Sequence, residues 1–325
     1  MRKVKLGALQ PDYLYPAPAY DCMSDCYVGD AAVIVENFVK ARLQTTLDLL
    51  EQAGIEGCDA VTTCEDICGT SLYGVDTLHE AVFPTLLEMT APLAEEALSS
   101  LARKYSMYIV GCYNKRIDGR NYNVASIFDR QGRIVGKYRK THLPAYEKWA
   151  VTPGDVLNVF DLDFGRVGIA ICYDIVFPEV VEILALQGAE IVFHPTAGYN
   201  GEHTLRTRAN DNSVAVVTAK NYSYDAPGQS SIIDRRGQVL ADAGFYRNVV
   251  VSSRIDLDDR KAQPEWHYET HTSGFADIRE RRLRERRPEL YGALTRELHP
   301  RLETPDRDGQ REIIKKIKAG TCRWQ

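Results

Sequence analysis

The chain has 325 residues, of which 44% are hydrophobic and 26% are charged, and its formal net charge is −5. This composition is typical of a globular protein, and the length is sufficient for a large buried core. The negative net charge does not favour nucleic acid as a partner, and no apolar run approaches the roughly 18 residues that a membrane helix needs. We therefore expect a cytoplasmic protein without a signal peptide, whose partners include neither nucleic acid nor a membrane.

Eight cysteines are spread along the chain, and no two of them form a C-x-x-C pair. In a long chain with no export signal, reduced thiols are the expected state. Neither of the two closely spaced pairs has a partner pair at the spacing of a zinc site, so we expect no bound metal. The cysteines are Cys22, Cys26, Cys58, Cys64, Cys68, Cys112, Cys172 and Cys322.

The first half of the chain alternates segments of strand and helix character. Residues 31–53 repeat apolar side chains at steps of three and four, which predicts a helix that Gly54 closes. The stretch from Pro92 to Tyr105 has a similar amphipathic pattern and predicts a second helix. Short apolar runs predict strands at Lys5–Leu9, 58–66, 107–114, 122–129 and 134–140.

The second half continues this alternation. Residues 158–172 predict a hairpin-like pair of strands, and residues 229–244 predict a hairpin about Arg235–Arg236–Gly237. Helices are predicted at 178–187 and Thr204–Asp211, and strands at 189–195 and 213–221.

Strands and helices that alternate in this way predict a mixed α/β sandwich. We assign residues 1–257 to one domain, in which residues 10–30 hold three prolines and four tyrosines. That stretch is a candidate inserted loop, which would act as a lid, a subunit contact or a packed surface loop. Residues 258–325 are rich in charge and lack strand patterning, so we expect a C-terminal extension that packs on the core or on a neighbouring subunit.

Three polar side chains stand where predicted strands end: Glu65, Lys140 and Cys172. The carboxyl ends of strands in an α/β fold collect functional groups, so these residues are candidates for one site. A cysteine is a strong nucleophile only as the thiolate, and a base, a cation or a helix N-terminus activates it. Glu65, Lys140 and the helix that starts near Phe177 would supply these three. Taken singly, each residue has a plainer interpretation as a core cysteine or a solvated charge.

The segments CED, GKYRKTHLP and GIAICYDIVFPE contain these three residues and occur in this order. Together they resemble the nitrilase superfamily of carbon–nitrogen hydrolases. PAYEKWAVTPGD, AEIVFHPTA, RTRANDNSVAVVTAKN and GQSSIIDRRGQVLADAG also resemble that family, so the resemblance covers residues 4–257. The glutamate segment departs from the family pattern, which often has Pro-Glu where this chain has Cys64 before Glu65.

The resemblance implies a four-layer αββα sandwich and a Glu–Lys–Cys triad. Carried over to this chain, Cys172 is the nucleophile, Glu65 is the general base and acid, and Lys140 stabilises the oxyanion. Glu147 follows Lys140 by seven residues and resembles a second glutamate that positions substrate in many members. Its plainer interpretation is a surface charge. No metal or organic cofactor is implied.

These residues are sufficient for hydrolysis of a carbon–nitrogen bond. Cys172 would attack a carbonyl or nitrile carbon while Glu65 takes the thiol proton and later gives it to the leaving nitrogen. Lys140 and the backbone N–H of Tyr173 would stabilise the oxyanion. Ammonia or an amine would leave, and water activated by Glu65 would hydrolyse the thioester.

The residues around the nucleophile narrow the substrate. Nitrilases typically show Cys-Trp-Glu, whereas CYD in this chain resembles the amide-cleaving branches. We expect an amidase for a small linear amide or, alternatively, a carbamoylase for an N-carbamoyl substrate, with a nitrilase less favoured. ω-Amidases resemble CYDxRFPE, whose arginine is available for a substrate carboxylate. Val176 holds that place here, which weakens the case for an acidic substrate unless Arg206 or Arg208 binds the substrate carboxylate.

Candidate substrate-binding residues lie beside the nucleophile and after the strand that follows it. They are Tyr173, Thr196, Ala197, Tyr199, Asn200 and His203.

Two rival hypotheses stay open. One is a Cys–His hydrolase that pairs Cys172 with His142 or His194. The other is a non-catalytic, oligomeric interaction protein, whose function would not depend on Cys172. Members of the family usually dimerise and often build larger assemblies, so the resemblance implies a homodimer or a larger homo-oligomer.

Overall fold

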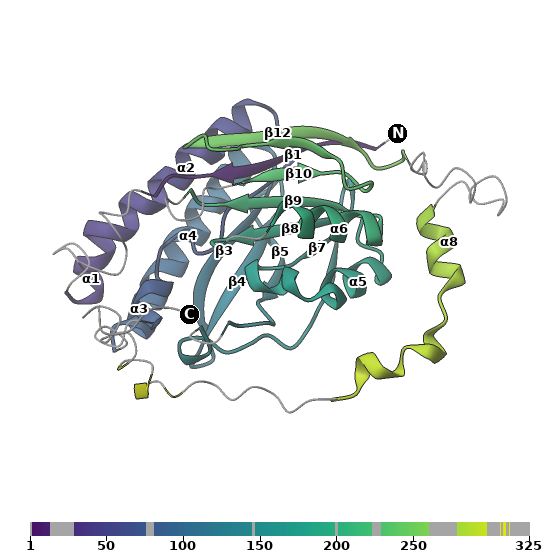
Figure 1. Cartoon of the computed structure of the whole chain (residues 1–325). Coiled ribbons are helices and arrows are strands. Elements are labelled where there is room, and N and C mark those ends of the chain that lie inside the picture. Colours follow the sequence, from purple (N-terminus) through teal and green to yellow (C-terminus); the bar gives the residue numbers. More distant parts are fainter. Residues whose placement is uncertain are drawn as a thin grey trace.

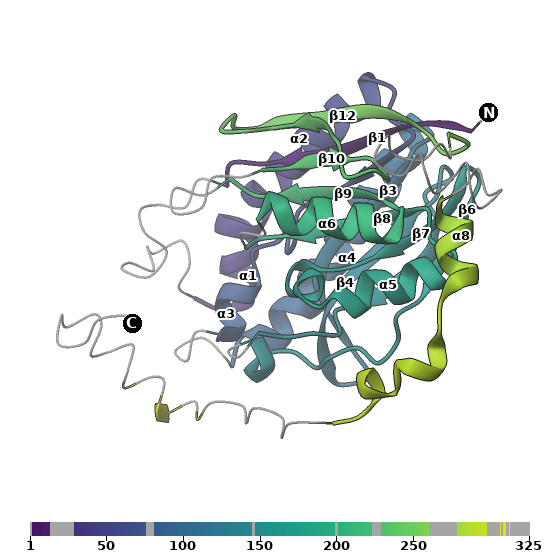
Figure 2. The same ribbon diagram turned by 45° about the vertical axis from the view of Figure 1, so that its right-hand side comes forward.

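The computed structural model describes residues 2–13, 29–75, 81–144, 147–198, 201–222, 229–259 and 278–297, with Asp306, Asp308, Gly309 and Glu312. In this part of the chain, two sheets of six strands lie face to face, and helices cover the outer face of each (Figures 1 and 2). The prediction of a four-layer αββα sandwich is confirmed.

The first sheet combines the N-terminal half of the chain with a late strand. The central pairs β1–β2 and β2–β3 are parallel, and the outer pairs are antiparallel. The sequence prediction missed β12, which pairs with β1 over eight residues. The strands in spatial order are β12 (Val249–Asp256), β1 (Lys3–Gln10), β2 (Ala60–Thr62), β3 (Tyr108–Ile117), β4 (Arg120–Phe128) and β5 (Ile134–Arg139).

The second sheet is built from the middle of the chain, and its central strands β7, β8 and β9 are parallel. Helices α5 (Pro178–Leu186) and α6 (Glu202–Asn212) cover its outer face (Figure 2). The strands in spatial order are β11 (Val239–Asp242), β10 (Ser231–Ile233), β9 (Ala215–Lys220), β8 (Ile191–Thr196), β7 (Gly165–Ile169) and β6 (Val159–Leu162).

Three apolar layers hold the sandwich together. Parallel strands that are covered on both faces need apolar side chains at successive positions, and β8 shows this pattern. Its Ile191 and Phe193 face the other sheet, whereas Val192 between them packs with the residues of α5 and α6. Central strands of this kind are rigid, which matters because the candidate catalytic residues Glu65 and Cys172 follow the central strands β2 and β7.

The helices of the first half cover the outer face of the first sheet (Figure 1). The helix predicted at 31–53 is confirmed in position, but it consists of three pieces, the middle one a π-helical turn over Val35–Val39. The helices are α1 (Ala31–Ile34), α2 (Lys40–Ile55), α3 (Ser71–Val75) and α4 (Phe83–Tyr105).

Two predicted helix boundaries are wrong. Gly54 does not close its helix, which continues to Ile55, and Gly57 follows with a φ of +73°. Gly54 gives room to Tyr105, whose ring would lie 2.2 Å from a Cβ at that position. Helix α4 also begins well before Pro92, which it tolerates because that proline lies on the exposed side of the helix.

Part of the C-terminal region packs on the core. Helix α8 (Ile278–Glu285) lies beside the ends of α5 and α6. Arg279 donates to the carbonyl of Ala185, and Arg282 donates to the last carbonyls of α6, so both cations lie at helix C-termini. Short 3-10 turns follow at Pro288–Leu290 and Gly292–Thr295.

The domain division at residue 257 stays a prediction, and residues 14–28 of the candidate inserted loop lie outside the described residues. No helix in the described ranges has the length and apolar character needed to cross a membrane.

Candidate active site

Strand ends from both sheets meet at one end of the sandwich. Glu65 follows β2 and Lys140 follows β5 in the first sheet, while Cys172 follows β7 in the second. The backbone N–H of Glu65 donates to the carbonyl of Thr196 at the end of β8, at 3.4 Å. This contact joins the two sheets at the site, so the side chains are positioned by the rigid part of the fold.

Lys140 lies between two carboxylates. Its ammonium is 2.8 Å from Oε1 of Glu65 and 2.6 Å from Oε2 of Glu147. The amide of Asn123 donates to the same two glutamates, at 2.8 Å and 3.0 Å. Lys140 is only 2% exposed, so water does not screen these interactions effectively. The structure thus brings Glu65, Lys140 and Glu147 together in one buried network.

The network shifts the pKa of each member. Burial opposes the charge of Lys140, but Glu65, Cys172 and Glu147 outweigh burial and hold the pKa of Lys140 well above its usual value. Burial also opposes the charge of Glu65, yet Lys140 lowers its pKa below the usual range. Burial dominates at Glu147, whose pKa is raised. Glu65 is therefore the more acidic of the two carboxyl groups.

Cys172 adopts an uncommon backbone conformation, with a φ of +46°. Non-glycine residues rarely adopt this left-handed conformation, because it costs energy. It persists only where the surrounding structure holds it. A 3-10 turn, Cys172–Val176, follows at once, and α5 begins at Pro178, close to the start predicted near Phe177. The strand end and the turn thus hold the backbone of Cys172, the predicted nucleophile, in a strained state.

Asp174 holds this turn in place. Its buried carboxylate accepts hydrogen bonds from the backbone N–H groups of Ile171 and His142, at 2.8 Å and 2.9 Å. It also accepts one from the hydroxyl of Tyr138, at 2.7 Å. These donors lower its pKa against the effect of burial. Asp174 therefore anchors the residues on both sides of the nucleophile.

The thiol of Cys172 faces the network. It interacts with the Glu65 carboxylate and with the hydroxyl of Thr196. Burial and the charge of Glu65 raise its pKa to about 11, although Lys140 acts in the opposite direction. The resting group is consequently a thiol at neutral pH, and it would need a base to become a strong nucleophile.

Only some of the residues predicted to bind substrate lie beside Cys172 and Glu65. Thr196 contacts the thiol, and the N–H of Ala197 donates to Oε2 of Glu65 at 3.0 Å. Tyr173 is half-buried, and its ring packs edge-on against Phe177. His203 is exposed on α6. Tyr199 and Asn200 lie outside the described residues.

The two histidines of the rival Cys–His hypothesis support the backbone around the nucleophile. Nε2 of His194 lies 3.2 Å from the carbonyl oxygen of Cys172, and its Nδ1 lies 3.2 Å from the Thr218 hydroxyl. Burial lowers the pKa of His194 to about 4. Nδ1 of His142 lies 3.0 Å from Asp174.

Sequence reasoning missed Asn123 and Asp174 as members of the site. Asn123 is buried in a strand whose neighbours are apolar, and a polar side chain in such a run is the signal that indicates it. Asp174 was considered only as part of the CYD segment. Its position inside an apolar stretch carries the same signal.

Comparisons with known proteins identify the family. The family model described as carbon–nitrogen hydrolase matches residues 35–265. The chain belongs to the carbon–nitrogen hydrolase family. It is 32% identical to the omega-amidase NIT2 of Bos taurus over 244 residues, which cover 69% of this chain and 86% of that protein. It is 33% identical to the omega-amidase NIT2 of Homo sapiens over 229 residues, or 64% and 80% of the two chains.

Solved structures share the fold. A carbon–nitrogen hydrolase from Helicobacter pylori superposes with a TM-score of 0.69 at 23% identity, covering 91% of this chain and 99% of that chain. The Nit3 protein of Saccharomyces cerevisiae, a member of branch 10 of the nitrilase superfamily, superposes with a TM-score of 0.63 at 23% identity, covering 86% and 97%. The predictions of a nitrilase-type fold and of a carbon–nitrogen hydrolase that acts as an amidohydrolase are confirmed.

Proposed function

We propose that this amidohydrolase cleaves a small linear amide through a thioester on Cys172 and releases ammonia or an amine. The observation that carries the proposal is that buried Lys140 forms ion pairs with Glu65 and Glu147, while the thiol of Cys172 faces Glu65. The relatives named omega-amidases support an amide as the substrate.

In the first step, sulfur of Cys172 attacks the amide carbon while the thiol proton moves to Glu65. The raised pKa of the thiol, about 11, keeps the thiolate scarce at rest, so proton transfer accompanies the attack. The left-handed turn presents the thiol at the strand end. Holding the nucleophile and base in fixed positions removes much of the entropic part of the barrier.

The negative charge that develops on the carbonyl oxygen needs nearby donors. Lys140 and the backbone N–H of Tyr173 supply them in this proposal. The tetrahedral intermediate then expels the nitrogen, which takes the proton from Glu65, and a thioester remains. Glu147 positions the substrate and helps to hold Lys140, with which it forms a 2.6 Å ion pair.

The second half of the reaction returns the enzyme to its resting state. Glu65 accepts a proton from water as that water attacks the thioester, and then protonates the departing thiolate. Asn123 and Asp174 act as positioning residues, because they bind the carboxylates and the turn rather than the reacting atoms. No metal or organic cofactor takes part in these steps.

We also propose a cytoplasmic location and a homo-oligomer. The described cysteines are free thiols, which supports a reducing compartment. Ile183 and Leu186 on α5 are 37% and 39% exposed, which supports a contact between subunits over this helix.

The experiment that tests the function measures ammonia release from primary amides, N-carbamoyl amino acids and nitriles. We expect turnover of the amides, and a loss of at least about 10⁴-fold in kcat for Cys172→Ala. Cys58→Ala removes a buried thiol elsewhere and serves as the matched control, with activity within about twofold of the parent.

A preference for N-carbamoyl compounds would replace the amidase by a carbamoylase with the same thiol mechanism. Turnover that survives in Cys172→Ala would refute the mechanism itself.

A further inference from the structure

A second cysteine lies behind the buried network of the candidate active site. Cys112 is a fully buried residue of β3. It is paired with Ala125 of β4, so Asn123, two residues before Ala125, lies diagonally opposite on the same face of the sheet. The thiol of Cys112 donates to Oδ1 of Asn123 at 3.4 Å. Cys112 therefore contacts the amide that in turn donates to Glu65 and Glu147.

Cys112 also holds the chain on both sides of Glu65. Its backbone N–H donates to the hydroxyl of Thr63, and its carbonyl accepts from the N–H of Ile67, each at 3.0 Å. Between these two contacts, the backbone N–H of Asp66 donates to the sulfur. Asp66 has a φ of +50°, which non-glycine residues rarely adopt, so this contact supports a strained backbone. The thiol thus lies between the segment that carries Glu65 and the amide that binds its carboxylate.

The thiol fixes the orientation of the amide of Asn123. An amide can exchange its oxygen and nitrogen by a half-turn of the side chain. Here Nδ2 donates to the two glutamates at 2.8 Å and 3.0 Å, which leaves Oδ1 for the thiol. Burial raises the pKa of the Cys112 thiol well above its usual value, so the thiol keeps its proton and remains a donor. Without this donor the buried Oδ1 would lose its hydrogen bond, which is costly.

We propose that Cys112 is a positioning residue for Glu65 and acts through the amide of Asn123. This inference rests on the proposed function, because it concerns the carboxylate that takes the proton of Cys172. Oε1 of Glu65 accepts from Asn123 and from Lys140, at 2.8 Å each. Two fixed donors on one oxygen prevent the carboxylate from turning, so its position relative to the thiol of Cys172 is held. Proton transfer requires that the base stay within hydrogen-bond reach of the thiol.

Three substitutions separate the hydrogen bond from packing. Cys112→Ala and Cys112→Val both remove the donor, and the valine fills the volume that the alanine leaves empty. Cys112→Ser keeps a donor in nearly the same place. The readout is ammonia release from acetamide, propanamide and butanamide. We expect kcat to fall about 10-fold in the alanine and valine variants with KM within about threefold, because the base is misplaced and binding is not. The serine variant should keep kcat within about threefold of the parent.

A double-mutant cycle tests whether Cys112 acts through Asn123. Asn123→Ala removes the amide and should lower kcat about 100-fold. Adding Cys112→Ala should then lower kcat by no more than about a further twofold, because no amide is left for the thiol to orient. If the two losses multiply in full, the thiol acts independently of the amide.

The pH profile is a readout that a loss of packing alone would not move. Burial raises the pKa of Glu65, whereas Lys140, Cys172 and Asn123 lower it. When the amide loses its orientation, the contribution of Asn123 weakens and the pKa of Glu65 rises. The acid limb of kcat/KM reports the ionisation of the base in the free enzyme. We expect this limb to move to higher pH by about half a unit in Cys112→Ala and Cys112→Val, and to stay in place in Cys112→Ser.

Cys68→Ala is the matched control, since it removes another buried thiol from the loop that follows Glu65. It should keep kcat within about twofold of the parent and leave the acid limb in place. Urea denaturation establishes that each variant is folded. If Cys112→Ala does not fold, the valine and serine variants make the same comparison.

Equal losses of kcat in Cys112→Ser and Cys112→Ala, fully multiplicative losses in the cycle, or a parent-like kcat in Cys112→Ala would overturn the inference. Each of these results leaves the proposed function intact, provided that the parent turns over the amides and Cys172→Ala does not. If the parent cleaves none of the amides, or if turnover survives in Cys172→Ala, the proposed function fails and the inference fails with it.

Discussion

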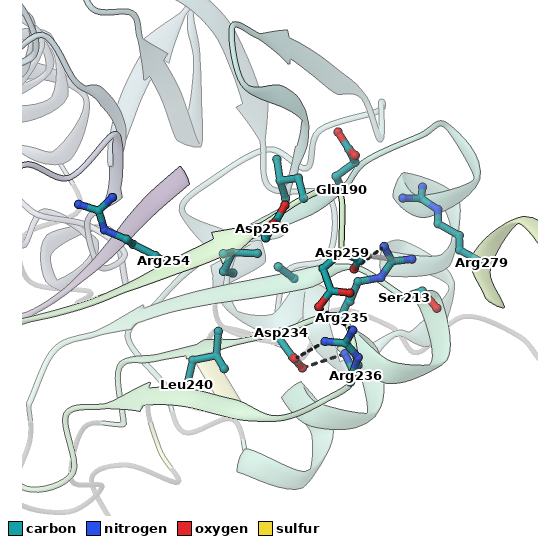
Figure 3. A pocket seen from close by; sticks show the side chains of 13 residues that line it. Glu190, Ser213, Asp234, Arg235, Arg236, Leu240, Arg254, Asp256, Asp259 and Arg279 are labelled. Atoms are coloured by element: carbon teal, nitrogen blue, oxygen red, sulfur yellow. Dashed lines mark hydrogen bonds and ion pairs between the residues drawn. The ribbon is translucent and has the colours of Figure 1, made fainter. Parts of the chain in front are cut away.

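The two ends of strand β8 each carry a cluster of charges, and the clusters differ in burial. At the end that Thr196 closes, Lys140 is 2% exposed and its partner Glu65 is 8% exposed. At the other end, Glu190 precedes the strand and lines a cavity of about 180 Å³ (Figure 3). There Arg236 pairs with Asp259 at 2.9 Å, and the two side chains are 20% and 39% exposed.

The two clusters also differ in the balance of their positive and negative side chains. Four arginines and four acidic residues line the cavity, so the charges balance locally and water screens them. The buried cluster has one ammonium for two carboxylates, and water cannot compensate for the imbalance. Burying charges in this way is costly for folding. In the proposed mechanism these charges move protons and stabilise an oxyanion, which gives a reason for that cost.

The largest effect should come from removing the cation of the buried cluster. Lys140→Met leaves Glu65 and Glu147 without a counter-ion in a buried site. We expect activity to fall at least about 10³-fold and the free energy of unfolding to fall by about 3–5 kcal/mol, measured by ammonia release and by urea denaturation.

Adding Glu147→Gln removes one of the two repelling carboxylates and serves as the control. The double variant should regain part of the stability and none of the activity. An unchanged denaturation midpoint in Lys140→Met would contradict the view that the cluster is held by its lysine.

A pH-dependent effect of intermediate size is expected from His194. Its pKa in the folded state is about 4, against an ordinary value of 6.5. Between these values the unfolded chain holds the extra proton, so stability falls as the pH falls from 6.5 to 4. The loss amounts to about 3 kcal/mol at 1.36 kcal/mol per pKa unit.

His194→Gln keeps a donor for the carbonyl of Cys172 and does not titrate. Its free energy of unfolding, measured in denaturant at pH 7 and pH 4, should fall about 3 kcal/mol less than that of the parent. The exposed His203→Gln is the control and should follow the parent. Parallel curves for the parent and His194→Gln would show that the buried ring is not the proton acceptor.

Sequence patterns predicted the residues of the buried cluster better than they predicted the segments around it. The apolar runs that end at Glu65, Lys140 and Cys172 identified the strands, and the motif resemblance brought these residues and Glu147 into one site. The structure places all four together, while their catalytic roles stay a proposal. Local pattern was sufficient here because each residue follows a strand that the sequence alone predicts.

Other features depended on contacts between distant segments. The register of β8 and β9, for example, places Lys220 opposite Thr196, and no local sequence pattern indicates this pairing. Strand β12 is half-exposed and was not predicted, since its partner β1 lies at the opposite end of the described core sequence. The amphipathic pattern predicted a helix from Pro92, yet α4 begins at Phe83 and keeps this proline on its exposed face.

The smallest effect on stability and activity should come from a substitution in the more exposed cluster beside the cavity. Arg236→Met removes the partner of Asp259 beside the cavity. Since both side chains are partly exposed, we expect the free energy of unfolding to change by no more than about 1 kcal/mol, less still in high salt. Activity should stay within about twofold of the parent. A loss of several kcal/mol, or a loss of turnover, would contradict the view that the partly exposed charges contribute little.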